Sequence, residues 1–160
     1  MPIDGSHGIS AGLGIAAWEL IKAVMTSVLK RRTDQGEAKR KVLREDVAAA
    51  ITAVNVCLGS AIENFTSVSN SARKSELSSA IRHGVLDVAH RFQSVNVGLS
   101  EIGAECLSSG YMIAFRKALT MILDDSSQLV LDADNPAITA MYRASHNLQM
   151  ALTKTKYIAT

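Results

Sequence analysis

Residues 43–61 read LREDVAAAITAVNVCLGSA, and their pattern decides the fold. Apolar residues recur here at alternating spacings of three and four, which is the period of an α-helix that buries one face. They are Leu43, Val47, Ala50, Val54, Cys57 and Ala61. No proline lies between Pro2 and Pro136, so no residue in between has to interrupt a helix. We predict a core-facing helix over residues 37–68.

The same periodicity predicts helices over most of the remaining chain. We expect a turn at the Ser- and Asn-rich residues 67–75, a helix over residues 72–107 and another over residues 111–131. A last helix begins cleanly, because Asn135 is a good N-cap and Pro136 suits the first helical position. The predicted inner faces comprise Leu77, Ile81, Val85, Val88, Phe92, Val95, Leu99, Ile102, Met112, Phe115, Leu119, Ile122, Leu129, Ile138, Met141, Tyr142, Ser145, Leu148 and Leu152. No strand-like alternation persists, so the predicted fold class is all-α.

A length of 160 residues suits a single domain with a sizeable core. We predict an N-terminal apolar helix within residues 1–31, a basic linker at residues 32–36 and a bundle over residues 37–160. Short links between long amphipathic helices favour antiparallel neighbours. The expected architecture is therefore an up-and-down helical bundle of four long helices plus the N-terminal apolar helix.

Basic residues gather in one segment of the chain. The net charge is +2, but residues 30–44 hold seven basic residues and two acids, a local charge of +5 against −3 for the rest. Such a concentration suits a local anionic partner. Aromatic residues make up only 4% of the chain, too few for a protein that stacks nucleic-acid bases, so nucleic acid is disfavoured as the partner.

The cysteines and the N-terminus indicate the compartment. Cys57 and Cys106 lie in apolar helical surroundings and form no C-x-x-C pair, which predicts two reduced core thiols. The first ten residues lack the basic start of a signal peptide and include Asp4. We therefore expect a cytoplasmic protein that is recruited to a membrane through its N-terminal helix.

His83, Asp87 and His90 form the sharpest chemical constellation, because spacings of four and three put them on one face of a helix. Histidine and carboxylate are suitable ligands for a transition metal, and a metal-dependent hydrolase using these three residues is the enzymatic alternative. Their face lies roughly opposite Ile81 and Val88, however, which predicts an exposed polar surface. We assign no catalytic residue, no metal ligand and no cofactor.

The N-terminal helix carries the strongest functional signal. Its apolar stretch of about 20 residues is long enough to cross a bilayer, and Lys30, Arg31 and Arg32 follow where anionic headgroups would meet it. The apolar residues expected to contact the membrane are Leu13, Trp18, Leu20, Val24 and Val28. Glu19 and Lys22 would be costly in hydrocarbon unless they lined a shared polar path in an oligomer. The alternative is one more core helix followed by a solvated loop.

Met1-Pro2-Ile3 and the run GISAGLGIAA at residues 8–17 resemble the glycine- and alanine-rich start of certain cell-death domains, the fungal HeLo-type and plant powdery-mildew-resistance-type helical bundles. The resemblance covers about 30 of the 160 residues. It implies an N-terminal apolar helix ahead of a four-helix bundle, able to insert into membranes after oligomerisation.

Together these features predict a non-enzymatic interaction and oligomerisation module with a membrane-active N-terminal helix, of the cell-death or defence effector type. Its expected partners are a second copy of the chain or another protein, together with an anionic membrane. Two alternatives stay open. One is a small protein-binding regulator or immunity factor without a membrane role, and the other is the metal-dependent hydrolase.

Overall fold

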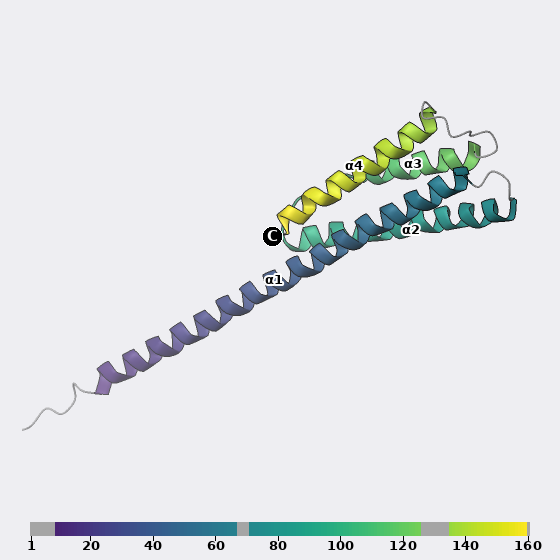
Figure 1. Cartoon of the computed structure of the whole chain (residues 1–160). Helices are drawn as coiled ribbons and strands as arrows, with labels where there is room; N and C mark the ends of the chain where they lie inside the picture. The colour runs from purple at the N-terminus through teal and green to yellow at the C-terminus, as the bar shows by residue number, and fades with distance from the viewer. Residues whose placement is uncertain (1–8, 67–70, 126–134, 160) are drawn as a thin grey trace, which may run out of the picture. The chain divides into compact units, whose positions relative to one another are not determined.

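The computed structural model describes residues 9–66, 71–125 and 135–159, with the backbone alone for residues 9–18, 65–66, 71 and 124–125. These residues form four helices: α1 (Ile9–Thr66), α2 (Ser71–Glu101), α3 (Ser109–Asp125) and α4 (Pro136–Ile158), as Figure 1 shows. No strand occurs in the described ranges, and the predicted all-α class is confirmed. The chain divides into two compact units, Met1–Ala38 and Lys39–Thr160, and α1 contributes to both.

The linker predicted at residues 32–36 is wrong, because α1 runs through them without a break. The N-terminal apolar helix is consequently part of α1 and not a separate element. Two residues of the predicted linker, Arg32 and Gln35, are good helix formers. Gly36 costs only about 1 kcal/mol relative to alanine in a helix interior, and without a proline this penalty does not end the helix.

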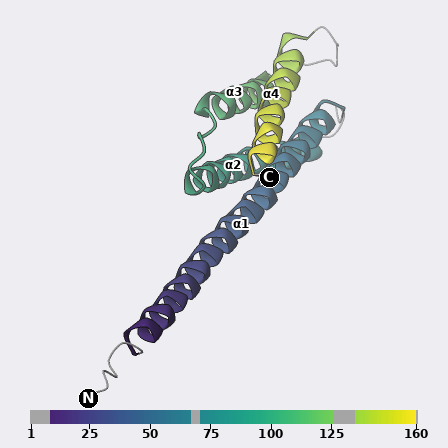
Figure 2. The same ribbon diagram turned by 90° about the vertical axis from the view of Figure 1, so that its left-hand side faces the viewer.

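Within residues 39–160, α1 and α2 approach closely at two glycines. A Cβ atom placed on Gly84 of α2 would lie 3.0 Å from Sγ of Cys57, and one on Gly98 would lie 3.0 Å from Cδ1 of Leu43. The steps from Leu43 to Cys57 and from Gly84 to Gly98 are equal in length and opposite in direction along their helices. The two helices therefore run antiparallel in a fixed register, side by side in Figures 1 and 2.

The fourth helix lies against α1 with its direction reversed. The Arg44 guanidinium donates from Nη1 to the carbonyl oxygen of Ala159 at 2.8 Å, and the Gln149 amide donates to Oδ1 of Asn55 at 2.6 Å. Helix α3 packs against both α2 and α4. Each of the four helices in this unit thus has two helical neighbours.

The buried core matches most of the apolar positions expected from the sequence. The largest fully buried side chains are Leu43, Val47, Val54, Ile81, Val88, Leu99, Phe115, Leu119, Ile122, Met141, Leu148 and Leu152. Tyr142 was expected on the inner face of α4 but is 48% exposed, because a residue next to Met141 is turned by about 100° away from it. The predicted core residue Leu129 lies outside the described residues.

Helix α2 ends earlier than expected, at Glu101 and not near residue 107. Gly103 has a φ of 74°, the amide of Ala104 donates to the carbonyl of Leu99 at 2.9 Å, and the amide of Gly103 donates to that of Ser100 at 3.1 Å. These bonds form a Schellman motif, which needs a left-handed residue after the helix. Glycine at residue 103 therefore sets the end of α2.

Two asparagine side chains form hydrogen bonds that fix the segment before α3 and the start of α4. The Asn96 side chain accepts from the amide of Leu107 at 2.7 Å and donates to its carbonyl at 3.3 Å, which fastens the α2–α3 link to α2. Asn135 accepts from the amide of Ala137 at 2.9 Å and precedes Pro136. The predicted N-cap and first position of α4 are confirmed.

Alanine at residue 103 should destabilise the fold, while alanine at Gly59 should stabilise it. The first substitution places a Cβ in the left-handed region and should lower the free energy of unfolding by about 1 kcal/mol. The second lies on an exposed stretch of α1 with no atom within 4 Å of the new Cβ, and should raise it by about 0.5–1 kcal/mol. Thermal and urea denaturation of the two variants measures both. Stabilisation by Gly103→Ala would contradict the proposed role of the Schellman motif.

Candidate functional site

A continuous row of exposed apolar side chains marks the N-terminal unit. Between residues 19 and 38 every residue is exposed except Gly36, which is partly exposed. Six large apolar side chains lie among them, and we call this set the apolar strip: Leu20 (68% exposed), Ile21 (50%), Val24 (55%), Met25 (61%), Val28 (45%) and Leu29 (60%). Exposed apolar residues that are contiguous, and not scattered singly, mark interaction surfaces.

The apolar strip occupies one side of α1. At about 100° per residue, its six members fall within about half of the helix circumference, and Glu19, Lys22 and Thr26 fall within the other half. The Lys22 ammonium pairs with the Glu19 carboxylate at 3.2 Å, and the Thr26 hydroxyl donates to the Lys22 carbonyl at 2.8 Å. This stretch of α1 is therefore an amphipathic helix whose polar face makes hydrogen bonds and an ion pair of its own.

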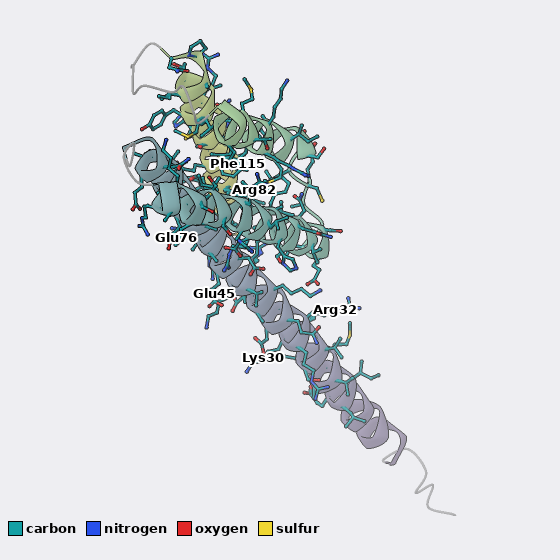
Figure 3. The ribbon with its side chains drawn as sticks, turned by 90° about the vertical axis from the view of Figure 1, so that its right-hand side faces the viewer. Lys30, Arg32, Glu45, Glu76, Arg82 and Phe115 are labelled. Atoms are coloured by element: carbon teal, nitrogen blue, oxygen red, sulfur yellow. The ribbon has the colours of Figure 1, made fainter. Side chains whose placement is uncertain are left out.

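A cationic turn follows the apolar strip. Lys30, Arg31 and Arg32 are all exposed, and Figure 3 shows Lys30 and Arg32 projecting from different sides of the helix. Three consecutive residues on a helix spread over about 200° of its circumference. The apolar strip is therefore followed by positive charge around more than half of the helix circumference.

The other basic residues of segment 30–44 have partly structural roles that the sequence did not reveal. The Lys39 ammonium lies 3.8 Å from the Glu101 carboxylate at the end of α2. The half-buried Arg44 bonds the carbonyl of Ala159 at the end of α4, where a cation also complements the helix dipole. Of the seven basic residues in segment 30–44, all but Arg44 are exposed. Lys39 and Arg44 contact the ends of α2 and α4, whereas Lys30, Arg31 and Arg32 directly follow the apolar strip.

The described part of α1 includes one window, within Glu19–Asn64, that is long and apolar enough to cross a membrane, and a third of that window is buried. Every 18-residue window that begins at residues 19–44 contains at least three charged residues. The qualifying window therefore belongs to the bundle part of α1, and core helices commonly pass this test. The predicted contacts Leu13 and Trp18 lie outside the residues whose side chains are described.

His83, Asp87 and His90 lie on the exposed side of α2, as predicted. Nδ1 of His83 lies 2.8 Å from the carbonyl oxygen of Ser79, and the Asp87 carboxylate pairs with Arg91 at 3.0 Å. No group of three histidine, cysteine or acidic side chains is arranged to hold a metal ion in the part of the chain whose side chains are described. Two of the three candidate ligands thus have local partners on α2 itself.

The two cysteines differ, which corrects the prediction of two core thiols. Cys57 is 1% exposed, and burial raises the pKa of its thiol to about 11. Its Sγ lies 3.8 Å from the carbonyl oxygen of Ile81. Cys106 is exposed in the α2–α3 link, because α2 ends before it. The sequence pattern extended the helix to residue 107 and so misplaced this thiol.

An aromatic disulfide reagent should separate the two thiols. We expect one thiol per chain, that of Cys106, to react within seconds to minutes in the native protein. Cys57 should react only when the protein unfolds, because thiolate is the reactive form and burial keeps this thiol protonated. Cys106→Ser should abolish the fast phase and Cys57→Ala should leave it unchanged. Fast reaction of both thiols would contradict the burial of Cys57.

The raised pKa of Cys57 also predicts alkaline destabilisation. In the unfolded chain the thiol ionises near its ordinary pKa of 9.0, whereas in the folded chain it stays protonated to about 11. The stability associated with the neutral thiol is therefore complete below pH 9 and is lost between pH 9 and 11, by roughly 1 kcal/mol at pH 10. Urea denaturation at pH 8 and pH 10 should show this loss in the free energy of unfolding. In Cys57→Ala the loss between the two pH values should be smaller by roughly 1 kcal/mol.

Comparison with known proteins adds no family to these observations. The sequence matches no protein-family model, and neither the curated proteins nor the solved structures include a significantly similar chain. The function therefore has to be argued from the exposed side chains of the molecule itself.

Proposed function

We propose that this chain is a non-enzymatic interaction module whose N-terminal helix binds anionic membranes while its bundle provides self-association. The observation that carries the proposal is the apolar strip, six large side chains that are each 45–68% exposed on one side of α1. Fully burying a side chain of this kind is worth about 1.5–3 kcal/mol. The strip therefore represents a large unsatisfied driving force for association with an apolar phase or surface.

Charge favours an anionic bilayer as the occupant of this strip. Lys22 lies on the polar side of the helix, and Lys30, Arg31 and Arg32 follow at its end. Each lysine or arginine near an anionic lipid surface contributes about 1 kcal/mol of attraction. An amphipathic helix with an apolar half and a cationic rim is typical of helices that lie in the plane of the lipid headgroups.

The same helix would enter the hydrocarbon only under one condition. Glu19 and Lys22 form an ion pair that is 54% exposed at the lysine and 65% at the glutamate side chain, and dry hydrocarbon would remove this solvation. Several copies could instead turn these pairs toward a common polar path. In the proposal, surface binding comes first and any insertion depends on oligomerisation.

For residues 39–160 we propose an up-and-down four-helix bundle that acts as the assembly scaffold. Support comes from the reversed directions of α1 and α2 at the two glycine contacts, and of α1 and α4 at Arg44 and Gln149. A cytoplasmic protein recruited to membranes in this way would suit a cell-death or defence effector. The resemblance to HeLo-type domains would then reflect a shared use of the first helix.

The test is cosedimentation and dye release with vesicles of phosphatidylglycerol and phosphatidylcholine, compared with phosphatidylcholine alone. We expect binding that requires the anionic lipid and weakens with salt. The triple variant Leu20→Ser/Val24→Ser/Val28→Ser should bind at least about tenfold more weakly, since it removes three apolar contacts. The matched control Val42→Ser/Val56→Ser/Ile113→Ser changes comparably exposed apolar residues outside the strip and should bind like the parent.

Two outcomes would overturn the membrane proposal. The first is absence of vesicle binding by a folded parent chain. The second is equal loss of binding in the strip variant and in the control variant. If the strip variant instead lowers the oligomer size measured by analytical ultracentrifugation, with no lipid binding by the parent, the strip is a protein interface.

A further inference from the structure

A groove between α2 and α3, in the unit of residues 39–160, joins an apolar floor to two cationic side chains. Its volume is about 330 Å³, within the lower range of small-molecule sites. Its lining residues are Arg82, Val85, Leu86 and Ala89 of α2 and Arg116, Thr120 and Leu123 of α3. Figure 3 labels Arg82 on α2 and the buried Phe115 on α3.

Among the described residues, no side chain engages either arginine. The ion pairs among the described residues involve other side chains, and the guanidinium groups of Arg82 and Arg116 have no hydrogen-bond partner in the part of the chain that is described. Thr120, by contrast, already donates its hydroxyl to the Arg116 carbonyl at 2.9 Å. The groove therefore presents two available cations beside valine and leucine side chains.

The two arginines lie at different levels of the groove. The double hydrogen bond between Asn96 and Leu107 places the start of α3 beside Asn96, and from there α3 runs back along α2. Counting nine residues along each helix from this point, Arg116 lies level with Asp87, about one and a half turns from Arg82. At 1.5 Å per residue this separation is roughly 7–8 Å along the helix axis.

We propose that this groove binds an elongated organic dianion, with an acidic group at each arginine and an apolar segment over Val85, Leu86 and Leu123. Guanidinium groups bind carboxylates through paired, charge-assisted hydrogen bonds. A ligand with one acidic end would leave the second arginine beside its apolar tail, whereas two acidic ends match both. This assignment concerns a different surface from the apolar strip and does not depend on the membrane proposal.

The neighbouring groove between α3 and α4 provides a comparison. It has a similar volume of about 350 Å³ and two cations, Lys117 and Arg143. Its walls consist mainly of alanine, with Met121 as the one large apolar side chain that lines it. It therefore offers the same charge with much less apolar contact, and Arg143→Gln is a matched control for the loss of one exposed arginine.

Isothermal titration calorimetry of the full chain with decanedioate at low salt tests the proposal. Binding should saturate at one ligand per chain. Arg82→Gln and Arg116→Gln should each weaken it by about tenfold or more, as expected for losing a hydrogen bond to a charged group. Arg143→Gln should bind like the parent, and decanoate should bind the parent at least about tenfold more weakly than decanedioate does.

Circular dichroism establishes that each glutamine variant remains folded. Amide chemical-shift changes on adding decanedioate should be centred on residues 82–89 and 116–123. No saturable binding by the parent, equal affinity for decanoate and decanedioate, or the same loss of affinity in Arg143→Gln would each overturn the assignment.

Discussion

The close approach of α1 and α2 is the constraint on which the packing of residues 39–160 depends. Cys57 and Leu43 of one helix lie against Gly84 and Gly98 of the other, so near that a Cβ at either glycine would sit 3.0 Å from its neighbour. Two such contacts fix both the spacing and the register of the pair. Once they are fixed, Ile81, Val88 and Val95 share one buried cluster with the apolar row of α1, and residues of α3 and α4 complete that cluster.

Sequence periodicity predicted most of this core because burial of one helix face imposes a spacing that a single chain displays. It could not predict the register, since nothing in the sequence says which residue of α2 faces Cys57. For the same reason it missed the groove at Arg82 and Arg116, whose residues are far apart in the chain. The end of α2 depended on hydrogen bonds around Gly103, which is only one of several glycines in that region.

The basic segment shows where composition misleads. A basic linker was expected at residues 32–36, yet arginine and glutamine also favour helices, and α1 continues. The sequence could not distinguish Arg44, which bonds a helix end, from Arg31 and Arg32, which face solvent. For the candidate site, Leu20, Val24 and Val28 of the predicted contacts are exposed, as a contact surface requires.

The contact between α1 and α4 bears on the order of folding. The two hydrogen bonds described for this contact join residues separated by 94 and 115 positions, whereas the Asn96 bonds of the α2–α3 link span 11. Closing a long loop costs more entropy than closing a short one. The contact between α1 and α4 should therefore form last. Until it does, the inner face of α4 can pair with α1 of another molecule as readily as with its own. At high concentration, refolding would then yield exchanged dimers in which each copy completes the other.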